Sequence, residues 1–237
     1  MSSVLCDILG HMTAGGRVYV AGAVKQLQEL YADLFAADDV SALSVCELLD
    51  RQALRLREAH RRRDPVSRMQ ISSWHPRLIG CSAETAVAAL LTRDDARLTL
   101  AREHGFADWS TVERDRRESP DAAFEQAVDA LLEGDADSLT ALLDAKPSLI
   151  EQRSAYGHAA TLLHYVGSNG VETRRQQVPR SLVSLTRLLI ARGADINAGA
   201  KMYGGSTTLE LVRTSAHPHA AGLQAELEEL LKEHGAK

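Results

Sequence analysis

The chain has 237 residues, of which 45% are hydrophobic, 25% charged and only 4% aromatic, and its formal net charge is −5. This length allows one large domain or two small ones, and this composition excludes wholesale disorder. The negative charge argues against a general affinity for nucleic acid or an anionic membrane, and no apolar run approaches the roughly 18 residues of a membrane span.

The first half of the chain has the pattern of short helices. Apolar residues recur with a period close to 3.6 over 18–35, and Asp64 followed by Pro65 is typical of an N-cap and the first helical position. Scarce proline and the absence of alternating patterns predict about six helices and no strand here. The expected helices span 18–35, 41–63, Asp64 to the residue before His75-Pro76, Ser82 to Leu91, Thr92 to His104, and a short segment from Asp108.

A charged stretch that carries Pro120 separates two differently patterned regions. We therefore expect an N-terminal helical module over 1–118 and a second domain over 119–237. The helix over 18–35 is amphipathic, so a homodimer formed through the N-terminal helices is an open alternative.

The second region contains internal similarity. The segment 161–170, TLLHYVGSNG, and the later segment 185–198, LTRLLIARGADINA, together resemble the ankyrin repeat, T-P-L-H-x-A-x-x-G followed by V-x-L-L-L-x-x-G-A-D-V-N-A. Residues 127–143 resemble a degenerate first repeat, and 205–212 resemble the opening of a third. Thr161 and Thr207 are 46 residues apart, against about 33 for the family, and most of the surplus is the insertion 171–184, VETRRQQVPRSLVS.

The first region is also similar to known sequences. Residues 56–65, 72–78 and 91–109 resemble a helical module found ahead of ankyrin repeats in bacterial proteins. The resemblance implies an all-α fold, in which an N-terminal multi-helix module precedes a short ankyrin-repeat solenoid of about three repeats.

The same resemblance implies where a ligand binds. Thr161 and Thr207 are expected to cap helices, Leu163 and Leu209 to point inward, and the concave groove to hold a protein or small-molecule partner. His164 is expected to bond neighbouring loop backbone and to be structural. The residues that we expect to line the groove are Tyr156, His158, Tyr165, Asn169, Tyr203, Arg213 and His217.

Recognition without catalysis is the favoured hypothesis, and an enzyme is the alternative. Tyr156, His158, Glu210 and His217 are the candidate catalytic residues, because such groups can perform general acid–base chemistry on a small molecule. The expected reaction would be a cofactor-free elimination, addition or cyclisation under the insertion 171–184. Arg174, Arg175 and Arg180 of that insertion would either close over an anionic ligand or form a solvated loop.

No cofactor and no metal are expected. The sequence carries none of the common nucleotide, hydrolase or zinc-protease motifs, and His217-x-His219 lacks a third ligand at a recognisable spacing. The three cysteines are widely spaced and the chain start lacks a basic signal-peptide region, so we expect a cytoplasmic protein.

Overall fold

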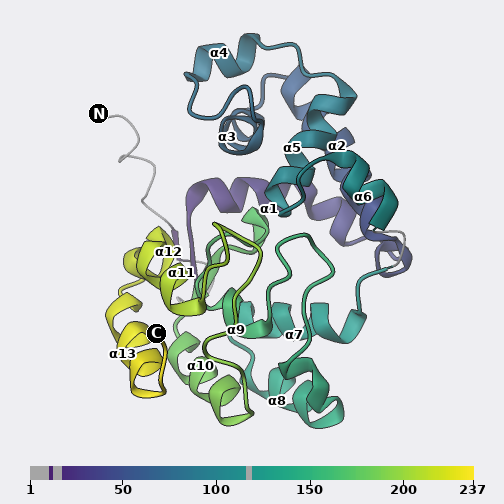
Figure 1. Ribbon diagram of the computed structural model, residues 1–237. Coiled ribbons are helices and arrows are strands. Elements are labelled where there is room, and N and C mark those ends of the chain that lie inside the picture. The colour runs from purple at the N-terminus through teal and green to yellow at the C-terminus, as the bar shows by residue number, and fades with distance from the viewer. Residues whose placement is uncertain (1–10, 13–17, 116–118) are drawn as a thin grey trace. The chain divides into compact units, whose positions relative to one another are not determined.

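The computed structural model describes residues 11–12, 18–115 and 119–237 (Figure 1). The chain divides into two compact units. The N-terminal unit spans Lys25–Pro120, and the C-terminal unit combines Asp121–Lys237 with the segment that ends at Val24. The expected helical module of residues 1–118 included this first segment, because nothing local in the sequence reveals its distant partner strand.

The N-terminal unit is built from helices, as expected. The helix α2 packs against α3 and α5, and its core contains Leu56, Ile71 and Leu100, all fully buried. The boundary between the two units falls within α1. The helices are α1 (Gly22–Phe35), α2 (Val45–Arg61), α3 (Pro65–Trp74), α4 (Ala83–Ala88), α5 (Arg93–Glu103) and α6 (Trp109–Asp115), with a 3-10 turn at Val40–Ala42.

The expected capping residues start these helices. Asp64 caps α3 with Pro65 at the first helical position, and Ser82 caps α4. Thr92 caps α5 through a reciprocal pair of contacts, because its hydroxyl accepts from the Asp95 N–H while the Asp95 carboxylate accepts from the Thr92 N–H. The first helix starts at Gly22 rather than at residue 18, because residues 18–20 form a strand.

The Asp95 carboxylate predicts an acid-sensitive N-terminal unit. Burial raises its pKa, but Thr92, His75 and Arg77 outweigh that effect and lower the pKa from 3.8 to about 2. A lowered folded-state pKa gives stability that is present above pH 4 and is lost as the pH falls towards 2, by about 2 kcal/mol. We expect the Asp95→Asn variant to lose most of this pH dependence. Urea unfolding monitored by tryptophan fluorescence tests this, since Trp74 and Trp109 both lie in this unit; the control is the exposed Asp94→Asn.

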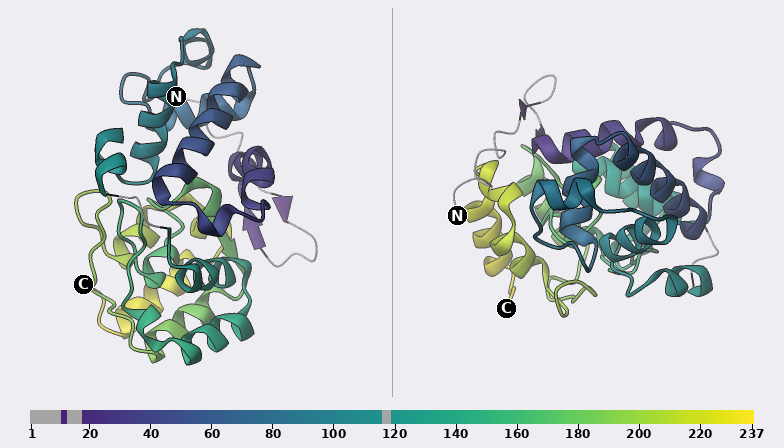
Figure 2. Two further views of the ribbon diagram at one scale, coloured as in Figure 1. Left: turned by 90° about the vertical axis from the view of Figure 1, so that its right-hand side faces the viewer. Right: turned by 90° about the horizontal axis from the view of Figure 1, so that it is seen from above.

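The C-terminal unit contains a succession of helices, which run from teal to yellow in Figures 1 and 2. The helix α7 packs against α8, α9 and α10, while α11 packs against α9 and α13. Gly134 ends α7 in the left-handed conformation, with φ of 83°. The helices are α7 (Ala122–Glu133), α8 (Ala136–Ala145), α9 (Leu162–Tyr165), α10 (Leu182–Ala191), α11 (Thr208–Thr214), α12 (Ala216–Ala220) and α13 (Gln224–Glu233), with 3-10 turns η3 (Pro147–Ile150) and η4 (Thr173–Arg175).

A small antiparallel sheet is an addition to the expected helical pattern. Its strands are β1 (His11–Met12), β2 (Val18–Val20) and β3 (Gln177–Pro179), in the order β1-β2-β3. Tyr19 pairs with Val178, so the sheet joins the start of the chain to the insertion 171–184. The molecule is therefore mostly helical, but the expectation of no strand before residue 118 was wrong.

The insertion 171–184 is part of the core and is not a solvated loop. It holds η4, β3 and the first turn of α10. Val171, Glu172 and Val178 are buried, and Arg175 is only 4% exposed. A segment with this burial is a structural element of the unit, so the expectation of a loop that closes over a groove is corrected.

Across the part of the chain that the structure describes, none of the helices combines the length and the apolar character needed to cross a bilayer.

Candidate functional site

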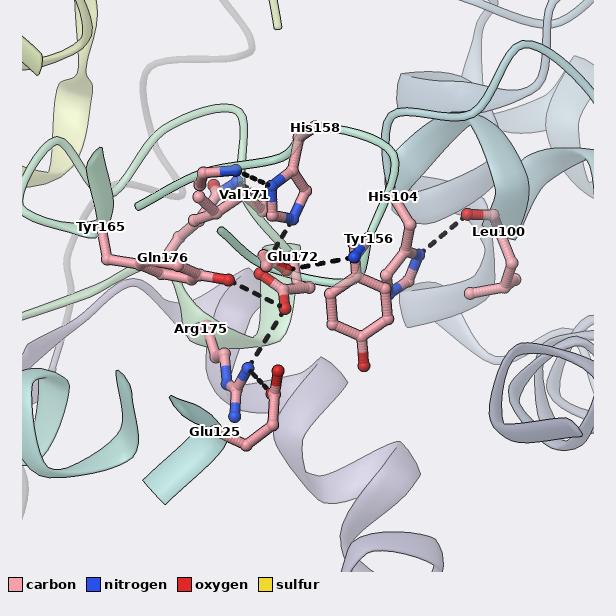
Figure 3. A network of polar contacts seen from close by, with 12 residues as sticks. Leu100, His104, Glu125, Tyr156, His158, Tyr165, Val171, Glu172, Arg175 and Gln176 are labelled. Atoms are coloured by element: carbon pink, nitrogen blue, oxygen red, sulfur yellow. Dashed lines mark hydrogen bonds and ion pairs between the residues drawn. The ribbon is translucent and has the colours of Figure 1, made fainter. Parts of the chain in front are cut away.

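A group of polar side chains, which we call the buried network, is centred on the buried residues His158, Glu172 and Arg175 of the C-terminal unit and reaches the surface at Asp129 (Figure 3). It joins the loop 151–160, the helix α9, the insertion 171–184 and the helix α7. Its members are Glu125, Asp129, Tyr156, His158, Tyr165, Glu172 and Arg175.

The loop 151–160 turns two of these side chains inward. The Ser154 N–H donates to the Ala160 carbonyl at 2.7 Å, which closes a tight loop between them. Ala159 adopts the left-handed conformation, with φ of 50°, and its N–H donates to the Tyr156 carbonyl. Within this loop Tyr156 is 1% exposed and His158 is 0% exposed.

The contacts of His158 determine the tautomer of its neutral ring. Its Nδ1 accepts the Ala160 N–H at 3.2 Å, so a neutral ring must carry its proton on Nε2. This Nε2 lies 3.5 Å from Oε2 of Glu172, which is longer than a normal hydrogen bond. The ring of Tyr165 meets the imidazole edge-on, with 6.1 Å between centroids.

Glu172 stands at the centre of the network, as Figure 3 shows. Its Oε1 accepts from the Tyr165 hydroxyl at 3.3 Å and from Arg175 at 3.2 Å. Burial raises the pKa of Glu172, but the contact with His158 and the charge of Arg175 outweigh it and hold the pKa well below its ordinary value. The carboxylate is therefore ionised inside the core.

Arg175 neutralises more than one acid. Its Nη1 donates to Oε2 of Glu125 at 2.6 Å, and its Nε donates to Oδ1 of Asp129 at 3.0 Å. Glu125 and Asp129 lie one turn apart on α7, so one guanidinium ties that helix to the insertion. Burial and the charge of Glu172 raise the pKa of Glu125 above its ordinary value, and the charge and hydrogen bond of Arg175 offset this only in part.

The structure does not bring the expected groove residues together on one surface. Tyr156, His158 and Tyr165 are buried in the core, where they pack on one another and on Glu172. The expectation that they line an open groove is therefore corrected. The physical reason is that the insertion fills the space beside them with its own polar and apolar side chains.

Two other expected residues, Asn169 and Tyr203, do reach the surface, and together with Thr214 they form what we call the Tyr203 face. Tyr203 is 63% exposed, and its hydroxyl donates to Oδ1 of Asn169 at 3.0 Å. The Asn169 amide donates in turn to the Thr214 hydroxyl at 3.1 Å. A Cβ on Gly170, which has φ of 71°, would stand 2.9 Å from the Tyr203 ring, so only glycine allows this close approach.

The remaining candidates have separate local roles. The exposed Glu210 accepts the Thr207 N–H at 2.8 Å and completes the cap of α11. The exposed Arg213 pairs with Glu228 on α13. His217 is half-buried on α12, and burial lowers its pKa.

His164 has the structural role that was expected. Its Nδ1 accepts the Thr161 N–H at 3.1 Å, and its Nε2 contacts the Ala198 carbonyl at 2.9 Å. Burial lowers its pKa to about 4, so the ring is neutral at pH 7 and joins the start of α9 to the loop before α11.

The acids of the buried network, Glu125, Asp129 and Glu172, were not among the candidates expected from the sequence. Arg175 was expected either to close over an anionic ligand or to lie in a solvated loop, and it does neither. A usable signal is present: Val171 and Val178 are apolar residues within the insertion, and their spacing is more typical of a buried segment than of a solvated loop.

Within the described residues, no group of three or more His, Cys, Asp or Glu side chains is placed to hold a metal ion. No model of a known protein family matches the chain, and no curated protein matches it.

Proposed function

We propose that the C-terminal unit is an ankyrin-like recognition module that binds a protein partner through the Tyr203 face. Three helix pairs support this reading: α7 with α8, α9 with α10, and α11 with α13. The first helices contact in series, since α9 touches both α7 and α11. Thr161 with His164, and Thr207 with Glu210, occupy the capping positions that the repeat pattern requires.

The observation that carries the proposal is that the side chain of Tyr203 is exposed and yet held in place. Its ring is largely exposed, yet its hydroxyl is held by Asn169 and its backbone is fixed in the left-handed region, with φ of 47°. A non-glycine residue in that region costs of order 1 kcal/mol, and such strain gathers at binding sites. An aromatic ring that is ordered before binding loses little entropy when a partner covers it.

Recognition is favoured over catalysis because the candidate acid–base groups are dispersed. Tyr156 and His158 have no surface that a substrate reaches, and the Glu210 carboxylate is engaged in a helix cap. General acid–base catalysis requires such groups within hydrogen-bond reach of one substrate. The Tyr203 face offers area and hydrogen bonds instead, which is what a protein interface uses.

The test is a comparison of Tyr203→Ala with Leu54→Ala, an exposed apolar residue of α2 in the other unit. Tagged full-length variants are used to recover partners from cells of the native host, and each recovered protein is quantified by mass spectrometry. We expect one or more partners to be recovered about tenfold less, or lower still, with Tyr203→Ala. A tenfold change in affinity corresponds to about 1.4 kcal/mol of binding free energy. Leu54→Ala should recover that partner normally, and both variants should unfold like the wild type.

The purified partner then gives the decisive measurement. Its Kd should rise by a similar factor for Tyr203→Ala, and Asn169→Ala should give an intermediate loss because the ring is then no longer held. Identical recovery and identical Kd for wild type and Tyr203→Ala would overturn the proposal.

A further inference from the structure

A second candidate site lies entirely within the N-terminal unit. A pocket of about 410 Å³ opens between the turn after α3, the α4–α5 connection and the first turn of α5. Pockets of 300–1,000 Å³ are the size that small ligands occupy. The lining residues that matter here are His75, Arg77, Leu78, Leu90, Leu91 and Asp95.

One wall of the pocket is apolar. Leu78 is half-buried and Leu91 is buried in this wall, whereas Leu90 at the rim of the pocket is 86% exposed. Burial of an exposed leucine side chain is favourable, so an apolar group of a guest would gain free energy by lying against Leu90.

The opposite wall is polar, and its acid is already neutralised. The Asp95 carboxylate accepts from the Thr92 N–H and hydroxyl at 3.0 and 2.7 Å, from Arg77 at 2.6 Å and from His75 at 3.2 Å. Four donors satisfy a carboxylate fully. Asp95 therefore has little capacity left to attract a cation or to repel an anion.

Arg77, in contrast, keeps donors to spare. Arg77 is 75% exposed and uses only Nη2 for Asp95 among the described contacts. His75 is 1% exposed, its Nε2 contacts Asp95, and its Nδ1 has no hydrogen-bond partner. When Nε2–H donates to Asp95, Nδ1 of the neutral ring is an acceptor, so the donors of this wall come from Arg77.

We propose that this pocket binds a carboxylate that carries an apolar group, with the carboxylate on Arg77 and the apolar group against Leu78 and Leu90. A guanidinium with free donors matches a carboxylate in both charge and fork geometry. A free apolar acid and the C-terminus of a peptide that ends in an apolar residue share this chemistry. The site is separate from the Tyr203 face and does not depend on it.

The experiment uses the full chain and two matched pairs of probes. Octanoate is compared with 1-octanol, and a short peptide ending in leucine with a free carboxylate is compared with the same peptide ending in an amide. Binding is followed by amide NMR shifts of residues 75–95 and by calorimetry. We expect the charged member of at least one pair to bind at least about tenfold more tightly than its neutral counterpart, and the pair that shows this identifies the source of the ligand.

Two variants assign the effect to the pocket. Arg77→Gln should remove the tenfold advantage of the charged probe without altering the affinity of the neutral one. Arg68→Gln, on α3 but not among the lining residues, should behave like the wild type. The proposal is overturned if neither charged probe binds more tightly than its neutral counterpart, or if Arg77→Gln leaves the advantage intact.

Discussion

Replacing Gly167 with alanine should destabilise the C-terminal unit by about 2–3 kcal/mol, the usual cost of forcing extra volume into a packed core. A Cβ at this position would stand 2.5 Å from Cβ of Leu211 and 3.3 Å from both the Leu211 backbone carbon and the His164 carbonyl oxygen. These are atoms of the backbone or directly attached to it, so no side-chain rotation relieves the clash. The chain after α9 and the helix α11 would have to move apart, which opens the buried contact around Leu211.

The measurement is urea unfolding followed by circular dichroism at 222 nm. Gly22→Ala is the matched control, because nothing lies within 4 Å of a Cβ built there and the same substitution adds the same methyl group. The control should lie within about 0.5 kcal/mol of the wild type. An unfolding free energy of Gly167→Ala equal to that of the wild type would show that α9 and α11 do not pack as closely as described.

Local chemistry made much of the N-terminal unit predictable. Ser82, Thr92 and the Asp64-Pro65 pair each start a helix, because a capping side chain satisfies N–H groups within three residues of itself. The T-x-x-H segment likewise led to the correct role for His164, whose contacts with Thr161 lie within one turn. Such interactions depend only on neighbours in the sequence, so a sequence pattern can predict them.

The errors arose where the partner is distant in sequence. Residues 18–20 have an apolar pattern that continues a helix, yet they pair with Gln177–Pro179, more than 150 residues away. His158 lies between Gly157 and Ala159, which predict neither burial nor exposure, and its burial depends on Glu172 and on the fold of the loop 151–160. In both cases contacts between residues distant in sequence override the local propensity, and a local sequence pattern cannot predict such contacts.

The insertion combines both difficulties. Its charged residues predict a solvated loop, because a charged side chain is rarely buried unless it is paired. Arg175 pairs with Glu172 and with two acids on α7, and this pairing makes the burial of Arg175 and Glu172 tolerable. Recognising this from sequence requires knowing that Glu125 and Asp129 face the insertion, which only the packing of α7 decides.

Arg175→Met should destabilise the C-terminal unit by about 3–5 kcal/mol at pH 7, as expected when one partner of a buried ion cluster is removed. Methionine retains the length and apolar stem of arginine but removes the cation that Glu125, Asp129 and Glu172 share. Glu172 is the most affected, because its carboxylate is fully buried and would keep the Tyr165 hydroxyl, the distant His158 and the charge of Arg174 in place of a direct ion pair with Arg175.

Lowering the pH should reduce the loss of stability caused by Arg175→Met. Without Arg175, burial raises the pKa of Glu125 and Glu172 in the folded state above their unfolded values, so the folded variant binds more protons than the unfolded chain. Its stability is then greatest below the unfolded pKa, near 4.5, and falls as the pH rises through the folded pKa values. In the wild type Glu172 behaves oppositely, since its lowered pKa gives stability that is lost in acid. The difference in unfolding free energy between the wild type and Arg175→Met should therefore become smaller as the pH is lowered from 7 to 5.

Arg192→Met is the matched control, because Arg192 pairs with Asp144 across a partly exposed surface, at 32% and 63% side-chain exposure. A surface ion pair contributes about 0–1 kcal/mol, so this variant should unfold almost as the wild type does, with no comparable pH trend. A deficit for Arg175→Met below 1 kcal/mol, or one that stays constant between pH 5 and pH 7, would mean that water reaches these carboxylates. The network would then be a solvated surface cluster, and the insertion would not be held in the core by charge.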